Sequence, residues 1–209
     1  MIDLHALLVV SAAFSVVTIS PGPANLGVCA VAMSAGRKPG IMFGFGLAAG
    51  LAFWGLVAAT GLGALLQTTA TALTALKVLG AVYLLWLALR SAKSALRASE
   101  QKLAIEVSAG KWFVQGLLLN VSNPKAVFAW MAALSVGLGV NGGVEQLAVA
   151  TLVCASIGVA NYIGHAALFS LPSARRLYAR GKRWIEGAVA VLFAVAGVSL
   201  LRSALTRTS

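Results

Sequence analysis

Long apolar stretches with few charged residues recur along the whole sequence. They lie at about residues 4–33, 41–66, 72–90, 113–138, 145–171 and 184–202. A run of about 20 apolar residues is long enough to cross the hydrocarbon core of a bilayer as a helix. Lone strands cannot satisfy their backbone in lipid, and no segment shows the ten-residue alternation of an outer-membrane barrel. We therefore predict an all-α polytopic membrane protein with six transmembrane helices.

The composition supports this fold class and a single domain. The chain is 60% hydrophobic and 10% charged, whereas soluble domains carry about 25% charged residues. Its 209 residues leave no room for a separate soluble domain, so we expect one membrane domain over residues 1–209. The net charge of +11 would suggest nucleic acid in a soluble protein. Here the basic residues lie in short stretches between apolar runs, so we exclude nucleic acid as a partner.

Basic residues mark one side of the predicted membrane domain. Twelve of the sixteen Lys and Arg residues lie in the connections after the first, third and fifth segments: Arg37, Lys38, Arg90, Lys93, Arg97, Lys102, Lys111, Arg175, Arg176, Arg180, Lys182 and Arg183. If six helices cross, these connections share one side, which the positive-inside rule places in the cytoplasm. The polar stretch 91–111 is then a cytoplasmic linker, and both termini lie outside. A re-entrant first segment would instead leave the amino terminus in the cytoplasm.

Two of the apolar segments contain helix-breaking residues. The first reads SPGP at residues 20–23, and the fourth reads SNPK at residues 122–125. Proline removes a backbone donor and clashes with the preceding turn, and non-helical backbone at membrane depth is tolerated only inside protein or along a cavity. Three segments separate the breaks, so residues 1–92 and 111–203 would form an inverted 3+3 repeat. Paired interruptions of this kind point to a transporter site; proline kinks used only for packing are the simpler alternative.

The breaks place groups suited to an anion near the middle of the membrane. A helix that restarts after Pro23 or Pro124 presents free backbone N–H groups and a partial positive charge, which suits a carboxylate. Asn25 and Asn123 add side-chain amides next to these helix starts, and Lys125 adds a full positive charge. The candidate substrate-binding residues are Pro21, Gly22, Pro23, Asn25, Asn123, Pro124 and Lys125.

Lys125 is the strongest functional candidate, because a charged residue inside a span is costly. Its partner would be a substrate carboxylate or backbone carbonyls freed by a break, since the acidic residues lie near segment ends or in loops. These are Asp3, Glu100, Glu106, Glu145 and Glu186. Desolvation disfavours the charged form of an amine, so Lys125 could also exchange a proton. His165 is a second candidate for a proton relay, although an interhelical hydrogen bond is the simpler interpretation.

Other features indicate packing rather than chemistry. Two small-xxx-small pairs occur in the second segment, Gly40 with Gly44 and Gly46 with Gly50. They predict close packing of the second helix against the first and would also permit a homodimer. Cys29 and Cys154 have neither metal nor redox spacing, so we expect no metal site and no cofactor. Ser20 and His165 are the only tempting nucleophile and base, and no motif supports them, so we do not expect an enzyme.

Four stretches together resemble the LysE/RhtB family of amino-acid exporters, also called LysE-type translocators. They are SPGPAN in the first segment, the glycine-rich second segment, NVSNPKA in the fourth, and KRWIEGAVAVLFAVAGVSLLR at the end. The resemblance implies a small bacterial inner-membrane permease that exports amino acids or their derivatives, driven by the proton-motive force. It also implies functional weight on Pro21, Gly22, Pro23 and Asn25, and on Asn123, Pro124 and Lys125.

The same resemblance bears on the substrate. Family members for lysine and arginine carry acidic residues in the membrane region, and this sequence has none centrally. A cationic side chain would then lack its counter-charge, so we expect a neutral substrate of the homoserine, threonine, leucine or cysteine-derivative kind. Efflux of an ion or metal cation is the alternative, and it would need carboxylates, His or Cys clustered in the spans.

Overall fold

The computed structural model describes residues 3–66, 70–96, 110–137 and 143–205. Within these ranges the chain forms eight helices and no strands, which confirms the all-α prediction. The helices are α1 (Leu4–Ile19), α2 (Pro23–Ser34), α3 (Arg37–Leu66), α4 (Ala70–Leu96), α5 (Trp112–Val121), α6 (Pro124–Gly137), α7 (Val144–Phe169) and α8 (Pro172–Leu205). Each predicted segment corresponds to one helix or to one broken pair. Most of the predicted linker, from residue 97 to 109, lies outside the described ranges.

Both predicted breaks are confirmed at the expected residues. In the first segment α1 ends at Ile19, α2 begins at Pro23, and the two helices are bent by 55°. In the fourth segment α5 ends at Val121 and α6 begins at Pro124. Proline fits the first position of a helix, because its missing N–H would be unpaired there anyway and its φ already suits the helix. The same residues that end one half-helix therefore start the next.

Fewer than the six predicted membrane spans are found when each helix is considered separately. In the described part of the chain, three helical stretches are long and apolar enough to cross a membrane: Arg37–Gly61, Val144–Phe169 and Arg183–Arg202. The α1/α2 pair makes a fourth if it is counted as one span. The α5 and α6 helices are apolar but short, with 10 and 14 residues, which at 1.5 Å per residue is less than the ~30 Å hydrocarbon core. A multi-pass membrane protein is thus established, and six spans stay a prediction.

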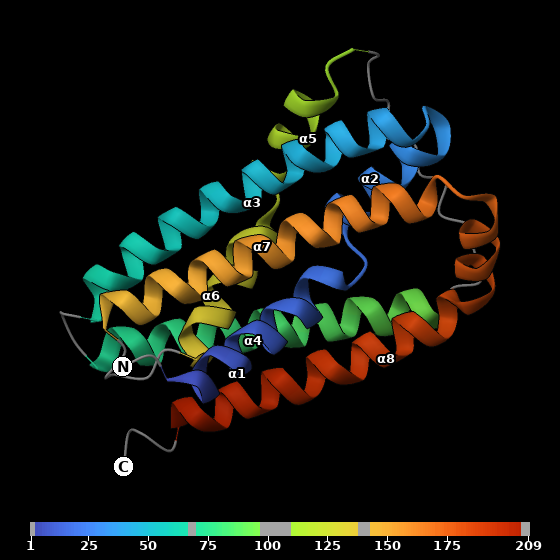
Figure 1. The fold of residues 1–209 in the computed structure, drawn as a ribbon. Helices are drawn as coiled ribbons and strands as arrows, with labels where there is room; N and C mark the ends of the chain where they lie inside the picture. The colour runs from blue at the N-terminus through green and yellow to red at the C-terminus, as the bar shows by residue number, and fades with distance from the viewer. Residues whose placement is uncertain (1–2, 67–69, 97–109, 138–142, 206–209) are drawn as a thin grey trace.

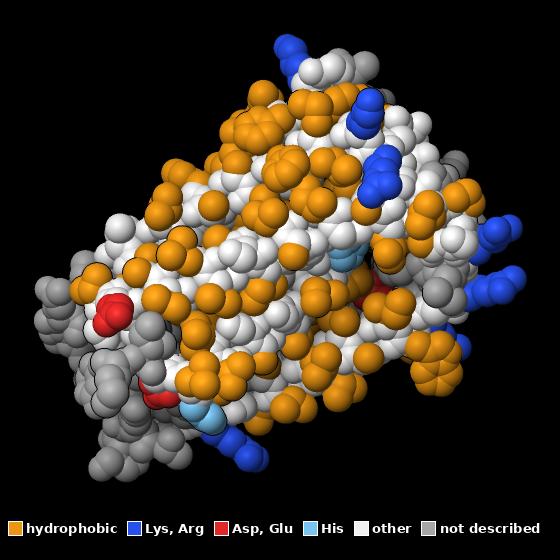
Figure 2. Space-filling model, viewed as in Figure 1, with side chains coloured by type: hydrophobic (Ala, Val, Ile, Leu, Met, Phe, Trp, Pro, Cys, Tyr) orange, Lys and Arg blue, Asp and Glu red, His pale blue; other side chains and the backbone are white. Residues whose placement is uncertain are grey.

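The helices form a bundle in which the broken pairs lie among long straight helices. Figure 1 shows α3 beside α7 and α4 beside α8, with the middle of α1 and α6 between these two layers. The start of α1 is tied to the start of α7, since the Asp3 backbone N–H donates to Gln146 Oε1 at 2.9 Å and Gln146 Nε2 donates to the Asp3 carbonyl at 3.0 Å. Both termini lie at this end of the bundle, and most Lys and Arg side chains on the visible face gather at the other end (Figures 1 and 2).

The glycines of α3 do not all pack where the sequence suggested. Gly40 packs on Ala32 of α2, as expected for contact with the first segment. Gly46 instead packs on α5, where an added Cβ would lie 2.0 Å from the Phe113 carbonyl oxygen. Gly50 also packs on α5, and Gly44 packs on α7. The predicted packing against the first segment is therefore confirmed for Gly40 and wrong for Gly44, Gly46 and Gly50, because a small-residue stripe specifies a close contact without specifying its partner.

The α3/α5 contact should be sensitive to a single methyl group. We expect Gly46→Ala to lower the stability by about 1–3 kcal/mol, because the new Cβ would overlap rigid backbone. Gly164→Ala is the matched control, since no atom lies within 4 Å of the Cβ added there and alanine favours a helix. Heating the purified proteins and measuring the monodisperse fraction by size-exclusion chromatography checks this. Equal midpoints for the two variants would contradict the close α3/α5 contact.

Candidate functional site

The two helix breaks meet in the interior of the bundle. The Lys125 Nζ atom, at the start of α6, donates a 2.6 Å hydrogen bond to the Ser20 carbonyl oxygen, which α1 leaves free at its C-terminal end. The lysine side chain is only 9% exposed and passes over Gly22, where an added Cβ would lie 3.0 Å from both Cδ and Nζ. Of the two partners predicted for Lys125, the structure therefore shows a backbone carbonyl freed by a break.

Asn25 braces the first break from the other side. Its Nδ2 group donates to the carbonyl oxygens of Thr18 at 2.7 Å, Ile19 at 3.2 Å and Ser20 at 3.0 Å. These are the last carbonyls of α1, which have no helical partner because the helix stops there. The Oδ1 atom of Asn25 accepts from Asn161 Nδ2 at 2.9 Å, which ties the break to α7. In this conformation the Asn25 amide is fully engaged by the chain.

Asn123 and Asn120 brace the second break in a similar way. Asn123 Oδ1 accepts from the Lys125 backbone N–H at 3.1 Å, so it caps α6, and its Nδ2 donates to Asn120 Oδ1 at 3.1 Å. Asn120 Nδ2 donates in turn to the Leu47 carbonyl on α3 and to the Tyr162 hydroxyl on α7. Asn120 thus joins α5 to α3 and α7.

The two restarting helices differ in how their first N–H groups are occupied. At α6 the Asn123 side chain already fills part of the predicted anion site. At α2 the capping position is Gly22, which makes no side-chain cap. An incoming carboxylate therefore has freer access to the start of α2 than to the start of α6.

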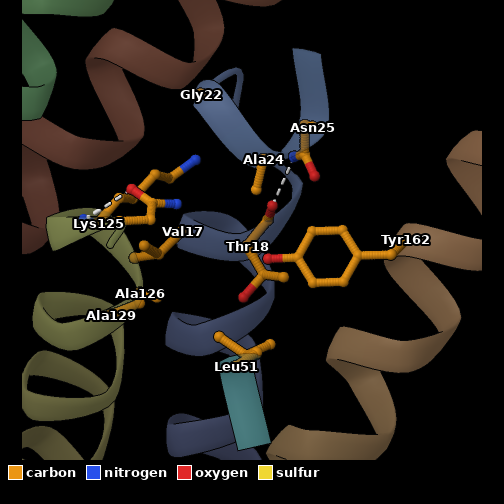
Figure 3. Close-up of a pocket in the computed structure, with 11 residues that line it drawn as sticks. Val17, Thr18, Gly22, Ala24, Asn25, Leu51, Lys125, Ala126, Ala129 and Tyr162 are labelled. Carbon is orange, nitrogen blue, oxygen red and sulfur yellow. Dashed lines mark hydrogen bonds between the residues drawn. The ribbon is translucent and has the colours of Figure 1, made fainter. Parts of the chain in front are cut away.

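A small cavity lies where the two breaks meet (Figure 3). It measures about 20 Å³, which is room for about one water molecule. Its wall consists of Val17, Thr18, Gly22, Ala24, Asn25, Leu51, Asn123, Lys125, Ala126, Ala129 and Tyr162. The conformation is closed, because an amino acid needs several times this volume.

The cavity wall contains some of the predicted site residues and not others. Gly22, Asn25, Asn123 and Lys125 line it. The three prolines at 21, 23 and 124 are absent from the wall; they shape the backbone that the wall residues stand on. The aromatic residues near the breaks also lie elsewhere: Trp54 and Trp130 donate their indole N–H groups to carbonyls of Val121 and Leu51.

His165 lies away from the cavity wall, one helical turn after Asn161. Its Nδ1 atom is 2.8 Å from the Asn161 carbonyl oxygen, which can only accept, so Nδ1 carries the proton in this bond. The ring stacks on Phe169, with centroids 5.9 Å apart. The Ser20 hydroxyl donates to the Val17 carbonyl and does not face His165 in any hydrogen bond. The structure thus forms no Ser–His pair, and the proton-relay role of His165 stays a prediction.

The structure buries three further polar residues, two of them in the cavity wall. Thr18 and Tyr162 line the cavity, and they look like ordinary members of apolar helices because helical register cannot be read when all faces are apolar. Glu186, expected near a segment end, does lie near the start of its span but is only 4% exposed. Among the described residues, no group of three or more His, Cys, Asp or Glu side chains could hold a metal ion.

The bracing by Asn25 can be tested without reference to transport. We expect Asn25→Leu to lower the stability by about 1–3 kcal/mol, because it leaves buried carbonyls at the end of α1 unpaired. Ser156→Ala is the control, since that exposed hydroxyl only donates to the Leu152 carbonyl of its own helix. The midpoint of thermal unfolding, followed by intrinsic tryptophan fluorescence, reports the difference. A midpoint for Asn25→Leu equal to that of the control would show that these bonds do not support the break.

Comparison with known proteins places this site in a known family. The family model for the LysE type translocator matches residues 15–204, which include both breaks. The chain is 33% identical over 193 residues to a threonine efflux protein of Salmonella typhi, covering 90% of this chain and 93% of the relative. It is 32% identical over 205 residues to the threonine efflux protein of Escherichia coli K12, with 96% and 99% covered. The uncharacterized membrane protein YahN of the same strain is 28% identical over 209 residues, with 98% and 92% covered. No solved structure matches the chain.

Proposed function

Because the chain belongs to the LysE type translocator family, we propose that it is a secondary-active exporter of neutral amino acids or their derivatives. Family membership confirms the resemblance seen in the sequence and makes the protein a membrane transporter rather than an enzyme. The threonine efflux relatives support an amino acid as the substrate. A bacterial inner membrane is the location that fits a proton-driven exporter of this class.

The buried Lys125 carries the proposal for substrate binding. Its ammonium group donates to a neutral backbone carbonyl, which does not compensate a full charge as a carboxylate does. A substrate carboxylate entering the cavity would replace the Ser20 carbonyl on Nζ and would also lie near the uncapped start of α2 at Gly22. Both groups favour an anion, and every α-amino acid supplies one.

The rest of the cavity wall favours a neutral side chain. Lys125 is the charged residue among the described residues that line the cavity, and none of the others is acidic. A lysine or arginine side chain would therefore meet a like charge, and it would find no counter-charge among the residues of the cavity wall. Efflux of a metal cation, the alternative, would need a cluster of ligands, and the described residues hold none.

The packing of the helices supports the inverted repeat. If α1/α2, α3 and α4 are exchanged with α5/α6, α7 and α8, several observed contacts map onto one another. The contact of α3 with α5 then corresponds to that of α7 with α1, and the contact of α1 with α6 corresponds to that of α5 with α2. The contact of α2 with α7 corresponds to that of α6 with α3. The contacts of α3 with α7 and of α4 with α8 are unchanged by the exchange. The α3·α5 and α1·α6 contacts are much more extensive than their counterparts, and α2·α3, α4·α6 and α1·α8 have at most weak counterparts, so the symmetry is only approximate. Repeats at about residues 1–92 and 111–203 with six crossings account for this pattern.

Transport would proceed by rocking the two units about the breaks. The cavity is closed, so substrate entry requires the α1/α2 and α5/α6 pairs to separate on one side at a time. We propose that protons are the coupling ion, with Lys125 as the proton carrier. His165 and Asn25 meet the same residue, Asn161, through its carbonyl and its side chain respectively, which makes His165 a candidate relay behind the cavity.

Export from preloaded cells tests the proposed function. Cells fed with dipeptides accumulate amino acids, and the external medium is profiled for wild type, Lys125→Ala and empty vector. We expect wild type to export at least one neutral amino acid. Lys125→Ala should export it at about one tenth of the wild-type rate or below, because a charge-assisted bond to the carboxylate is lost.

Lys38→Ala is the matched control, because Lys38 is exposed at the start of α3. This variant should export at the wild-type rate. Membrane abundance is measured for each variant by immunoblot. Export by Lys125→Ala at the wild-type rate, at equal abundance, would remove Lys125 from the mechanism. No difference between wild type and vector for any amino acid would reject the proposed substrate class.

A further inference from the structure

The Thr18 hydroxyl is buried in the cavity wall without a hydrogen-bond partner. The Thr18 residue is 6% exposed, and its Oγ1 atom has no partner among the described residues. A threonine or serine hydroxyl in a helix commonly donates to a carbonyl three or four residues earlier. Ser11, Ser15 and Ser34 do so here. Thr18 therefore does not follow this pattern, and it lies where α1 forms part of the cavity wall.

Tyr162 brings a second hydroxyl to the same place from α7. It is 4% exposed, and its oxygen accepts the 3.1 Å hydrogen bond from Asn120 Nδ2. Because that bond uses the oxygen as an acceptor, the phenolic hydrogen is still available to donate. Figure 3 shows the Tyr162 hydroxyl directed toward Thr18, and both residues line the cavity.

A buried hydroxyl group without a partner, such as that of Thr18, is costly unless something satisfies it. A ligand hydroxyl fits both side chains, because it can accept from Tyr162 and donate to Thr18 Oγ1. The remaining wall on this side is aliphatic, with Val17, Leu51 and Ala129. A short side chain that carries one hydroxyl group matches this surface better than a purely aliphatic or a long polar one.

We propose that Thr18 and Tyr162 form a subsite for the side-chain hydroxyl of the substrate, so that the protein selects short hydroxylated amino acids over their aliphatic isosteres. This inference rests on the proposed export function and adds to it the residues that would recognise the side chain of the substrate. Lys125 and the start of α2 hold the carboxylate, and the hydroxyl subsite lies on the α1/α7 side of the same cavity. Thr18 acts here as a specificity-determining residue.

The rival explanation is a buried water molecule that bridges the two hydroxyls. The cavity of about 20 Å³ has room for one. A water that only fills the closed state would leave transport selectivity unaffected by Thr18. The ratio of export rates for two substrates separates these explanations, because a purely structural role changes both rates together.

Threonine and valine make the sharpest pair of probes, since they differ only by a hydroxyl in place of a methyl group. Cells are preloaded with both from dipeptides, and the export ratio is measured for wild type, Thr18→Val and Thr18→Ser. We expect wild type to export threonine about tenfold faster than valine, Thr18→Val to reduce this ratio about tenfold, and Thr18→Ser to preserve it. The within-cell ratio is independent of how much protein reaches the membrane.

Several results would overturn the subsite. They are an unchanged ratio in Thr18→Val, an equal rate of threonine and valine export by wild type, or an equal loss of ratio in Thr18→Ser and Thr18→Val. The wild-type ratio keeps the test decisive even if Thr18→Val fails to accumulate. If wild type exports neither amino acid above the vector but exports a neutral one without a side-chain hydroxyl, the hydroxyl subsite is wrong and the proposed function stands. If wild type exports no neutral amino acid, the hydroxyl subsite and the proposed function are both wrong.

Discussion

The hydrogen bond between Lys125 and the Ser20 carbonyl is the interaction on which the arrangement of the two breaks depends. A buried ammonium group is stable only beside acceptors, and a helix end in the interior is stable only beside donors. The C-terminal end of α1 carries free carbonyls and a partial negative charge, and Lys125 presents a positive charge to it. Each break thus compensates the other, and neither broken helix would be stable in lipid alone.

Side-chain amides complete this compensation and also define how the site can move. Asn25, Asn120 and Asn123 are at most 5% exposed, and together they bond backbone groups or side chains on α1, α3, α6 and α7. Such a network is stable when every member is satisfied and unfavourable when it is half satisfied. Opening the cavity must therefore exchange these bonds for others. The hydrogen bond between Asn25 and Asn161 joins the first break to α7, so a rocking motion would strain it first.

The sequence predicts the breaks and the central lysine well because those signals are local. Proline ends and restarts a helix wherever it stands, so Pro23 and Pro124 begin α2 and α6 as expected. The partners of Gly46 and the cavity-lining role of Thr18 could not be predicted, because they depend on which apolar faces meet. In lipid all faces of a helix are apolar, so periodicity loses the information it carries in a soluble protein. The fourth segment shows a related effect, since α5 and α6 are each too short to cross the membrane alone.

The closed cavity links substrate selection to the transport cycle. A ligand shifts a conformational equilibrium only by its differential affinity for the two states. In the closed state Lys125 is bound to Ser20, and Thr18 Oγ1 is unpaired. A substrate that supplies a carboxylate to the first and a hydroxyl to the second gains energy in both places, while an aliphatic isostere gains it in one. The bond that would recognise the carboxylate therefore replaces the one that joins the two breaks, so substrate binding and gating cannot be separated by mutation of Lys125.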